Sequence, residues 1–393
     1  SDLQSIESTR SVLEAEQNKI NLLDKWQQNF ESLVLFHYER GQDKKAFEVS
    51  ERARARAFED LMPQPERMSA NNLERIQLNL NEGEVLLSFF TTGILDHDLP
   101  FLRQQTTSRT IIQELTTAPH TLLFIITPDG IDLKNCEIDP NLFVPKGLNR
   151  HDPERWLSAN TLKRVFQTLF EGVDSLNSAD KLYIIPHGSL HYIPFTAVLG
   201  SNLENDPTLV YLPSARMLSR SKSKAESSVI ELGSYVGVGY AGNDTDQQLL
   251  FASHEIEWVG RQQNGSRSLF SNGVSKEQLK SVAETSEVLH FACHSWFNYK
   301  RPMDSYLEIG DAEHLSAYEI AQWPLNSELV ALSACMTGVS RVLRGDEAMG
   351  LIRAFFYAGC KSVLMTQWEV EDLPTFLFMK HFFRSEEHTS ELQ

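Results

Sequence analysis

Two short apolar runs in the second half of the chain each end at a residue that can carry chemistry. Residues 287–294 are Glu-Val-Leu-His-Phe-Ala-Cys-His, and residues 327–335 are Ser-Glu-Leu-Val-Ala-Leu-Ser-Ala-Cys. Such runs are typical of central parallel strands, which are buried on both faces. Parallel α/β sheets place their functional groups beyond the carboxyl ends of these strands. The terminal residues His294 and Cys335 are what a thiol nucleophile and its base require.

The residues around these runs alternate between strand and helix patterns. This alternation predicts an α/β domain with a mostly parallel sheet flanked by helices. The predicted strands are 235–240, 267–270, 287–293, 305–310, 328–334 and 361–367, and the predicted helices are 248–260, 275–284, 316–323, 346–358 and 372–383.

An upstream half has its own strand pattern. Predicted strands cover 84–90, 121–127, 131–138 and 182–185, with an amphipathic helix at 153–171. A second histidine-rich segment follows the last of these strands and contains His187 and His191. We interpret both as structural or groove-lining, because no strand that ends on a nucleophile follows them at a comparable place.

Residues 1–61 have the periodicity of helices throughout. The run Gly41-Gln42-Asp43 ends one helix, and an alanine-rich helix follows it. This arrangement resembles the last tetratricopeptide repeat of an array, and the alternative is an ordinary helical hairpin. The charged run at 51–56, Glu-Arg-Ala-Arg-Ala-Arg, is predicted to be a solvated helix face, and Met62-Pro63-Gln64-Pro65 ends the helix.

Composition narrows the range of possible functions. The formal net charge of −17 argues against nucleic-acid binding, which normally needs a basic face. The four cysteines (Cys136, Cys293, Cys335, Cys360) form neither a disulfide framework nor the paired spacing of a zinc site. We expect no metal and no cofactor. The sequence shows no signal peptide and no apolar run of membrane-spanning length, so we expect a cytoplasmic protein that does not bind membranes.

Several ordered motifs strongly resemble the CHAT domain, a caspase-like peptidase fold that often follows tetratricopeptide repeats. They are His290–His294, Leu329–Cys335, Gly345–Leu351, Gln367–Asp372 and, upstream, Pro186–Phe195. The resemblance covers about residues 80–383. It implies that His294 is the general base and Cys335 the nucleophile. Generic reasoning alone would favour an inert, buried cysteine at this place.

The oxyanion of the tetrahedral intermediate would be held by the backbone amides of Cys335 and Ser295. Caspase-like enzymes commonly have Gly where this chain has Ser295, and the added Cβ could tighten the oxyanion pocket. The family's domain also normally continues past the last predicted helix, which suggests that the chain is truncated. Cys293 points to the opposite strand face from His294 and is expected in the core, and Cys136 and Cys360 are expected to be structural.

Separase-like relatives hold a basic substrate side chain with an acidic residue. The position here that matches it is Asp372, with Glu369 and Asp304 as alternatives. A carboxylate that faces Arg or Lys is physically sensible. The competing interpretation is that Asp372 only caps the helix that it begins.

The expected organisation is a helical, tetratricopeptide-like segment at 1–65, a caspase-like domain at 80–383 and a disordered or foreign tail at 384–393. The domain divides into an upstream half, 80–215, and a half with the His/Cys dyad, 230–383. We expect a cysteine endopeptidase that cleaves a specific protein partner and is regulated by a protein bound to its helical segment. The alternative is an inactive adaptor that binds protein partners. Another α/β hydrolase lacks support, because the sequence has neither a G-x-S-x-G elbow nor a phosphate-binding loop.

Overall fold

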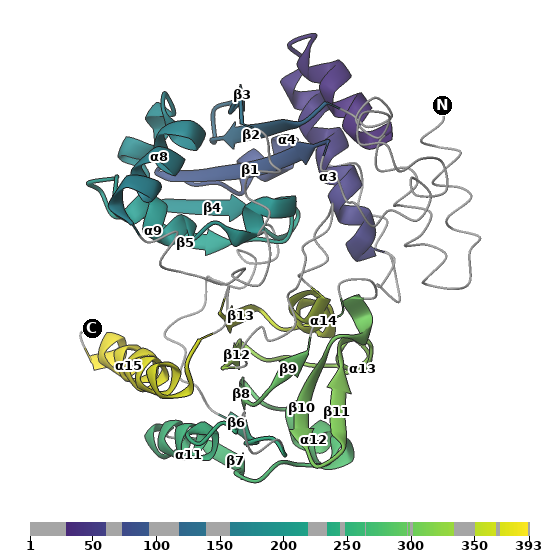
Figure 1. Ribbon diagram of the computed structural model, residues 1–393, viewed down its shortest axis with the longest axis vertical. Coiled ribbons are helices and arrows are strands. Elements are labelled where there is room, and N and C mark those ends of the chain that lie inside the picture. Colours follow the sequence, from purple (N-terminus) through teal and green to yellow (C-terminus); the bar gives the residue numbers. More distant parts are fainter. Residues whose placement is uncertain are drawn as a thin grey trace. The chain divides into compact units, whose positions relative to one another are not determined.

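The computed structural model describes residues 29–59, 73–93, 118–138, 158–218, 234–243, 248–263, 265–296, 298, 302–333, 350–366 and 370–391. The chain divides into two compact units, each described by itself below. One contains residues 1–224 with 341–346, and the other contains residues 225–340 with 347–393. Each unit is built on its own five-stranded sheet (Figure 1).

The sheet of the first unit has the order β3-β2-β1-β4-β5. The strands β1, β2 and β3 pair antiparallel, whereas β4 and β5 continue the sheet parallel to β1. The chain turns between β2 and β3, where the Thr127 N–H donates to the carbonyl oxygen of Gly130 over 3.0 Å. The strands are β1 (Glu84–Thr92), β2 (His120–Ile126), β3 (Ile131–Asn135), β4 (Lys181–Ile185) and β5 (Thr208–Tyr211).

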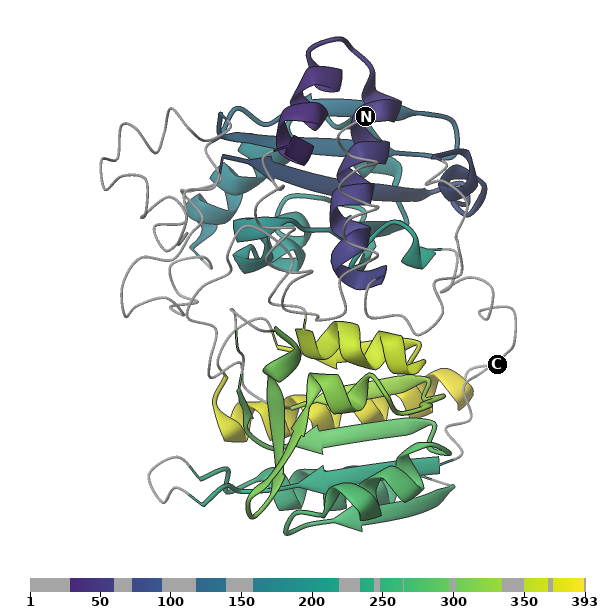
Figure 2. The same ribbon diagram turned by 90° about the vertical axis from the view of Figure 1, so that its right-hand side faces the viewer.

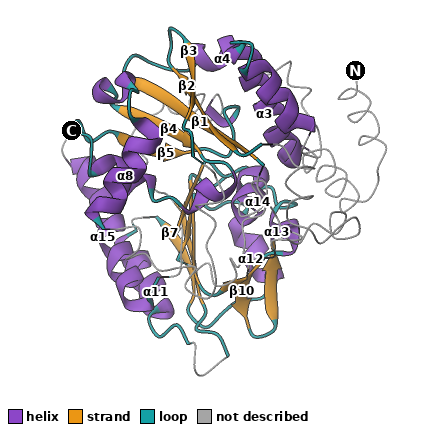
Figure 3. Cartoon of the chain, turned by 45° about the horizontal axis from the view of Figure 1, so that its top comes forward, coloured by secondary structure: helices purple, strands orange, loops and turns teal. Residues whose placement is uncertain are grey.

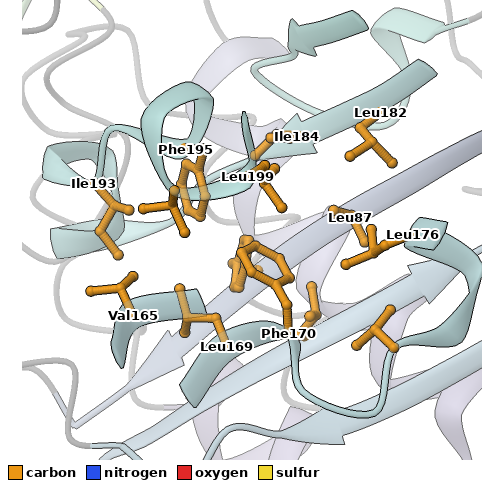
Figure 4. Close-up of a cluster of buried hydrophobic side chains, with 14 of the residues drawn as sticks. Leu87, Val165, Leu169, Phe170, Leu176, Leu182, Ile184, Ile193, Phe195 and Leu199 are labelled. Carbon is orange, nitrogen blue, oxygen red and sulfur yellow. The ribbon is translucent and has the colours of Figure 1, made fainter. Parts of the chain in front are cut away.

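Alternation along β1 and β2 separates two packed faces. Leu87 and Phe89 contribute to a buried cluster with α8 (Ala159–Phe170) and α9 (Phe195–Gly200). The cluster is shown in Figure 4, where aliphatic and aromatic side chains from the sheet and the helices interdigitate. Phe124 points to the opposite face of the sheet. There its ring packs edge to face against Phe47 of α3 (Asp43–Glu59), with ring centroids 5.5 Å apart. Helices therefore cover both faces of this sheet.

The described part of the N-terminal segment is a helical hairpin. Residues 29–38 are helical, and the chain turns at Gly41, whose φ of 61° suits glycine, before α3 begins at Asp43. This turn confirms the predicted helix end. Residues 1–28 lie outside the described residues, and assignment of the hairpin to a tetratricopeptide array stays a prediction.

The prediction of a solvated face at 51–56 is wrong for two of its residues. Glu51 is fully buried and Arg54 is 4% exposed. The Arg54 guanidinium donates hydrogen bonds to Glu51 Oε1 and Ser88 Oγ, each over 3.1 Å, and to the carbonyl oxygen of Phe89. Glu51 Oε2 accepts the backbone N–H of Ala215 over 2.8 Å. Burial of the pair is compensated by its mutual ion pair and by hydrogen bonds with Ser88, Phe89 and Ala215.

The sheet of the second unit is entirely parallel, with the order β13-β12-β8-β6-β7. A separate three-stranded antiparallel sheet has the order β11-β10-β9. The parallel strands are β6 (Ser234–Gly239), β7 (Ser266–Phe270), β8 (Val288–Ala292), β12 (Leu329–Leu332) and β13 (Ser362–Met365). The antiparallel strands are β9 (Ser295–Trp296), β10 (Tyr306–Gly310) and β11 (Glu313–Ser316).

Helices also cover both faces of the parallel sheet (Figure 3). On one face, α11 (Ala252–Gln262) and α15 (Asp372–Glu391) pack over a buried cluster that includes Tyr235, Val288 and Phe383. On the other face lie α12 (Lys276–Ala283), α13 (Ala317–Ile320) and α14 (Gly350–Ala358). In Figure 2 this second face is toward the viewer, with α15 behind the sheet.

The structure confirms the predicted α/β fold, with parallel-rich sheets flanked by helices, and places a strand at each predicted strand position. The pattern missed β5, β9 and β11, which are short, and their strand character depends on pairing with β4 and β10. Helix α15 continues through Glu391, into the expected tail. None of the described helices combines the length and apolar character that a membrane span requires.

We predict that Arg54→Met lowers the free energy of unfolding by about 3 kcal/mol, because it leaves the buried Glu51 carboxylate without its cation. Urea denaturation followed by circular dichroism would measure the loss. Lys44→Met is the matched control, since Lys44 lies on the same helix and pairs with Glu74 at 2.9 Å, but with 47% and 67% of the two side chains exposed. This control should leave the unfolding midpoint unchanged. Equal midpoints for the two variants would contradict the assignment of Arg54 and Glu51 to a buried network.

Candidate active site

The site is built on the neighbouring parallel strands β8 and β12. Val288 lies opposite Leu329 and Phe291 lies opposite Leu332, so each residue of β8 pairs with the residue 41 positions later (329 − 288 and 332 − 291). The pairing continues beyond the strand, because the Ser333 N–H donates to the carbonyl oxygen of Phe291 over 2.8 Å. Both strands therefore end at the same edge of the sheet.

His294 is the second residue after β8 and is half-buried. Its backbone carbonyl accepts the N–H of Glu308, over 2.9 Å, which ties it to β10. Its imidazole lies against Gly242, in the loop that follows β6. A Cβ on Gly242 would stand only 2.8 Å from Cδ2 and 3.0 Å from Nε2 of the ring. Close packing at a residue without a side chain thus fixes one edge of the imidazole.

Two of the predicted site residues lie outside the described residues. These are Cys335, together with its backbone amide, and Glu369. In the sequence, Cys335 is the second residue after Ser333. The predicted proximity of His294 and Cys335 is therefore taken up below as a proposal.

Ser295, the second predicted oxyanion residue, is the first residue of β9. It is 2% exposed and pairs with Leu307 of β10. The strand that directly follows His294 is therefore anchored by the small antiparallel sheet. The role of the Ser295 amide in catalysis stays a prediction.

Asp372 begins α15, and its carboxylate joins this helix to α11. Oδ2 of Asp372 accepts the backbone N–H of Phe251, the N-terminal cap residue of α11, over 2.8 Å. Burial raises the pKa of Asp372, opposed by hydrogen bonds from the amides of Phe251 and Leu250. The charge of Glu255 also raises this pKa, whereas His294 lowers it. Asp372 thus lies within electrostatic range of the predicted base and also fixes a helix terminus.

Asp304, the remaining acidic candidate, ends the short 3-10 helix η4 (Pro302–Asp304) and is half-buried. It lies in the segment that leads into β10, two residues before Tyr306 begins that strand. The structure therefore places Asp304 beside the small antiparallel sheet, whereas Asp372 lies at the junction of two helices. A role for Asp304 in substrate binding stays a prediction.

The other three cysteines fit the structural roles expected of them. Cys136, Cys293 and Cys360 are buried free thiols. Burial raises the pKa of Cys136 and of Cys360 to about 12, and it raises that of Cys293 further. A thiol held in its protonated form is a poor nucleophile.

His187 has a structural environment in the first unit, as expected. It is 3% exposed and stacks on Phe90, with ring centroids 4.6 Å apart. Its Nδ1 accepts the backbone N–H of Thr91 over 3.1 Å. This nitrogen is therefore occupied by the backbone of β1.

The sequence pattern gave no role to a buried polar network below the edge of the second sheet. Its centre is His290 of β8, which is fully buried. Nε2 of His290 lies 2.8 Å from Glu255 Oε1 and 3.3 Å from Ser333 Oγ, and Nδ1 lies 2.8 Å from the Tyr235 hydroxyl. One feature of the sequence could have indicated this network. Glu255 is an acidic residue on the otherwise apolar, buried face of α11, beside Ala252, Ile256 and Val259.

Within the described residues, no three His, Cys, Asp or Glu side chains are grouped so that they could hold a metal ion.

A parallel sheet with helices on both faces (Figure 3), and with a histidine that follows a central strand, is consistent with a caspase-like α/β domain. The CHAT domain model matches residues 159–392, which is more than half of the chain, so the protein belongs to the CHAT domain family. Members of this family are often cysteine peptidases. The match starts at α8, so the predicted upstream limit at residue 80 stays a prediction. A search of the curated proteins gave no match.

We predict that Gly242→Ala displaces the imidazole of His294, since the new Cβ would overlap the ring. Selectively labelled histidine NMR, with the His294 signals assigned by means of His294→Ala, should show shifted ring resonances. Gly172→Ala is the matched control, because Gly172 has a similar φ (79° against 84°) but no atom within 4 Å of the position that the alanine methyl group would take. Both variants carry the same backbone strain. Unchanged His294 resonances in Gly242→Ala would contradict the close packing.

Proposed function

We propose that the protein is a cysteine endopeptidase in which His294 is the general base and Cys335 the nucleophile. The observation that supports this most strongly is the register of β8 and β12. Paired residues differ by 41 positions, and so do His294 and Cys335 (335 − 294). Neighbouring strands lie about 4.8 Å apart, so continuing this register would put the two residues side by side at the sheet edge.

The chemistry follows from these two groups. His294 takes the proton of the Cys335 thiol, and the thiolate attacks the scissile carbonyl carbon. The backbone amides of Cys335 and Ser295 stabilise the oxyanion of the tetrahedral intermediate. His294 then returns the proton to the leaving amine as the C–N bond breaks. Water, deprotonated by His294, hydrolyses the thioester and frees the thiol.

We further propose that Asp372 holds a basic side chain before the scissile bond. This proposal is supported by the position of the Asp372 carboxylate, which is partly buried and within electrostatic range of His294. Its hydrogen bond to the Phe251 amide positions the carboxylate but leaves its negative charge. Asp304 and Glu369 are the alternative acidic residues for this role.

The proposed substrate is a specific protein partner, and a protein bound to the helical N-terminal segment regulates its cleavage. The support is that α3 is joined to the first sheet by the buried Arg54–Glu51 network. A conformational change in the hairpin would therefore alter the buried polar contacts that join it to the strands of that sheet. The hairpin would represent the end of a tetratricopeptide array.

We predict that Cys335→Ala and His294→Ala each reduce proteolysis to background while circular dichroism remains that of the wild type. Cleaved partners are identified by comparing N-terminal peptides in lysates treated with wild type and with Cys335→Ala. Cys293→Ala is the matched control, since this thiol adjoins His294 but is fully buried, and it should retain activity. Proteolysis that persists in Cys335→Ala or in His294→Ala would contradict the assignment of the dyad, whereas a wild type without proteolytic activity would favour the inactive adaptor.

We predict that Asp372→Asn removes the preference for Arg or Lys before the scissile bond, because a neutral amide no longer attracts a cation. Cleavage of a library of peptides that vary at this position would measure the preference. For the wild type the preference should weaken as the pH falls, and at a higher pH than for an ordinary aspartate, because burial raises the pKa of Asp372. Reduced stability with unchanged preference would show that Asp372 only fixes the helix termini, and Asp304→Asn would then be tested in the same assay.

A further inference from the structure

The buried network around His290 connects three neighbouring strands and one helix. Tyr235 belongs to β6, His290 to β8 and Glu255 to α11, and Ser333 directly follows β12. All four side chains are buried, with Ser333 the most exposed at 8%. Charged and polar groups at such depth are costly unless each has a partner, so these contacts constrain the elements that they join.

One arrangement of protons satisfies the contacts of His290. The Tyr235 hydroxyl donates to Nδ1, consistent with the strongly raised pKa of this buried phenol. Nε2–H then points to Glu255 Oε1, at 2.8 Å, and to Ser333 Oγ, at 3.3 Å. We assign the protons from this pattern of partners.

The same geometry excludes a second catalytic triad. A Ser–His–Glu triad needs the serine and the acid on different ring nitrogens. Here Glu255 and Ser333 are both on Nε2 of His290. The imidazole is also fully buried, so a substrate cannot contact it. The role of the network is therefore structural.

The residues of this network lie just before the edge of the sheet where the proposed dyad is expected. In the sequence, Ser333 is two residues before Cys335, and His290 is four residues before His294. Glu255 lies on α11, whose amino-terminal residue Phe251 is held by Asp372. The network thus joins the strand that leads to His294, the strand that leads to Cys335 and the helix beside them.

We propose that Glu255, His290 and Ser333 are positioning residues that hold the end of β12 against β8 and so set the separation of Cys335 from His294. This inference rests on the proposed dyad. Ser333 is the member that transmits the restraint, because it directly follows β12 and is two residues before the nucleophile in the sequence. Tyr235 contacts the opposite nitrogen of His290 and belongs to β6, on the other side of β8 from β12.

The test measures the thiol itself and needs no protein substrate. Full-length protein is alkylated with iodoacetamide across a pH series, and the Cys335 peptide is quantified by mass spectrometry. In the wild type the alkylation midpoint should lie below that of free cysteine, about 8.5, because His294 favours the thiolate. His294→Ala should raise the midpoint to that value.

Ser333→Ala should raise the midpoint by about half a pH unit or more, since it releases the strand that carries the nucleophile. Tyr235→Phe is the matched control. Each variant removes one neutral hydroxyl from the same imidazole, so a merely structural role gives equal effects on stability and none on alkylation. Tyr235→Phe should keep the wild-type midpoint, and Ser333→Thr, which restores a hydroxyl, should return to it.

The outcomes separate the two proposals. If His294→Ala raises the midpoint but folded Ser333→Ala does not, the dyad stands and the positioning role is overturned. Equal shifts in Ser333→Ala and Tyr235→Phe, or no rescue by Ser333→Thr, also overturn it. If the wild-type midpoint is that of free cysteine and His294→Ala leaves it unchanged, the dyad fails and the positioning role fails with it.

Discussion

The in-register parallel pairing of β8 and β12 is the constraint on which the site depends. Hydrogen bonds from Leu329 to Ser333 fix one strand against the other, and a slip by one residue would turn the side chains of β12 to the opposite face. The buried residues on both faces of β8 oppose such a slip, because it would expose apolar groups and separate His290 from Ser333. In the proposed dyad, the same pairing that stabilises the core determines which residues meet at the edge.

Buried polar contacts supply a second kind of constraint, and each unit has an example. In the first unit Arg54 and Glu51 join α3 to β1, and in the second Glu255 and His290 join α11 to β8. Apolar packing tolerates small shifts of a helix, whereas a buried charge loses its compensation when its partner moves. These networks therefore define the positions of the helices more sharply than the surrounding apolar side chains do.

The sequence predicted the fold and indicated candidate site residues, because both leave local patterns. Apolar runs marked β8 and β12, and the residues that end them marked His294 and Cys335. The burial of Arg54 could not be predicted in this way, because its partner Ser88 lies 34 residues away. Gly242 likewise has no local pattern that relates it to His294. Such contacts depend on the topology of the sheet, which brings the loop after β6 to the end of β8.

The spacing within the two strands relates the core to the candidate site. Side chains two and four residues apart along a strand share a face. His290 lies within β8 and His294 follows that strand, and Ser333, which directly follows β12, similarly precedes Cys335 in the sequence. The contact between His290 and Ser333 therefore joins the two chain segments just before they reach the residues of the proposed dyad in the sequence. Stability and the geometry of the dyad would then depend on the same pair of strands.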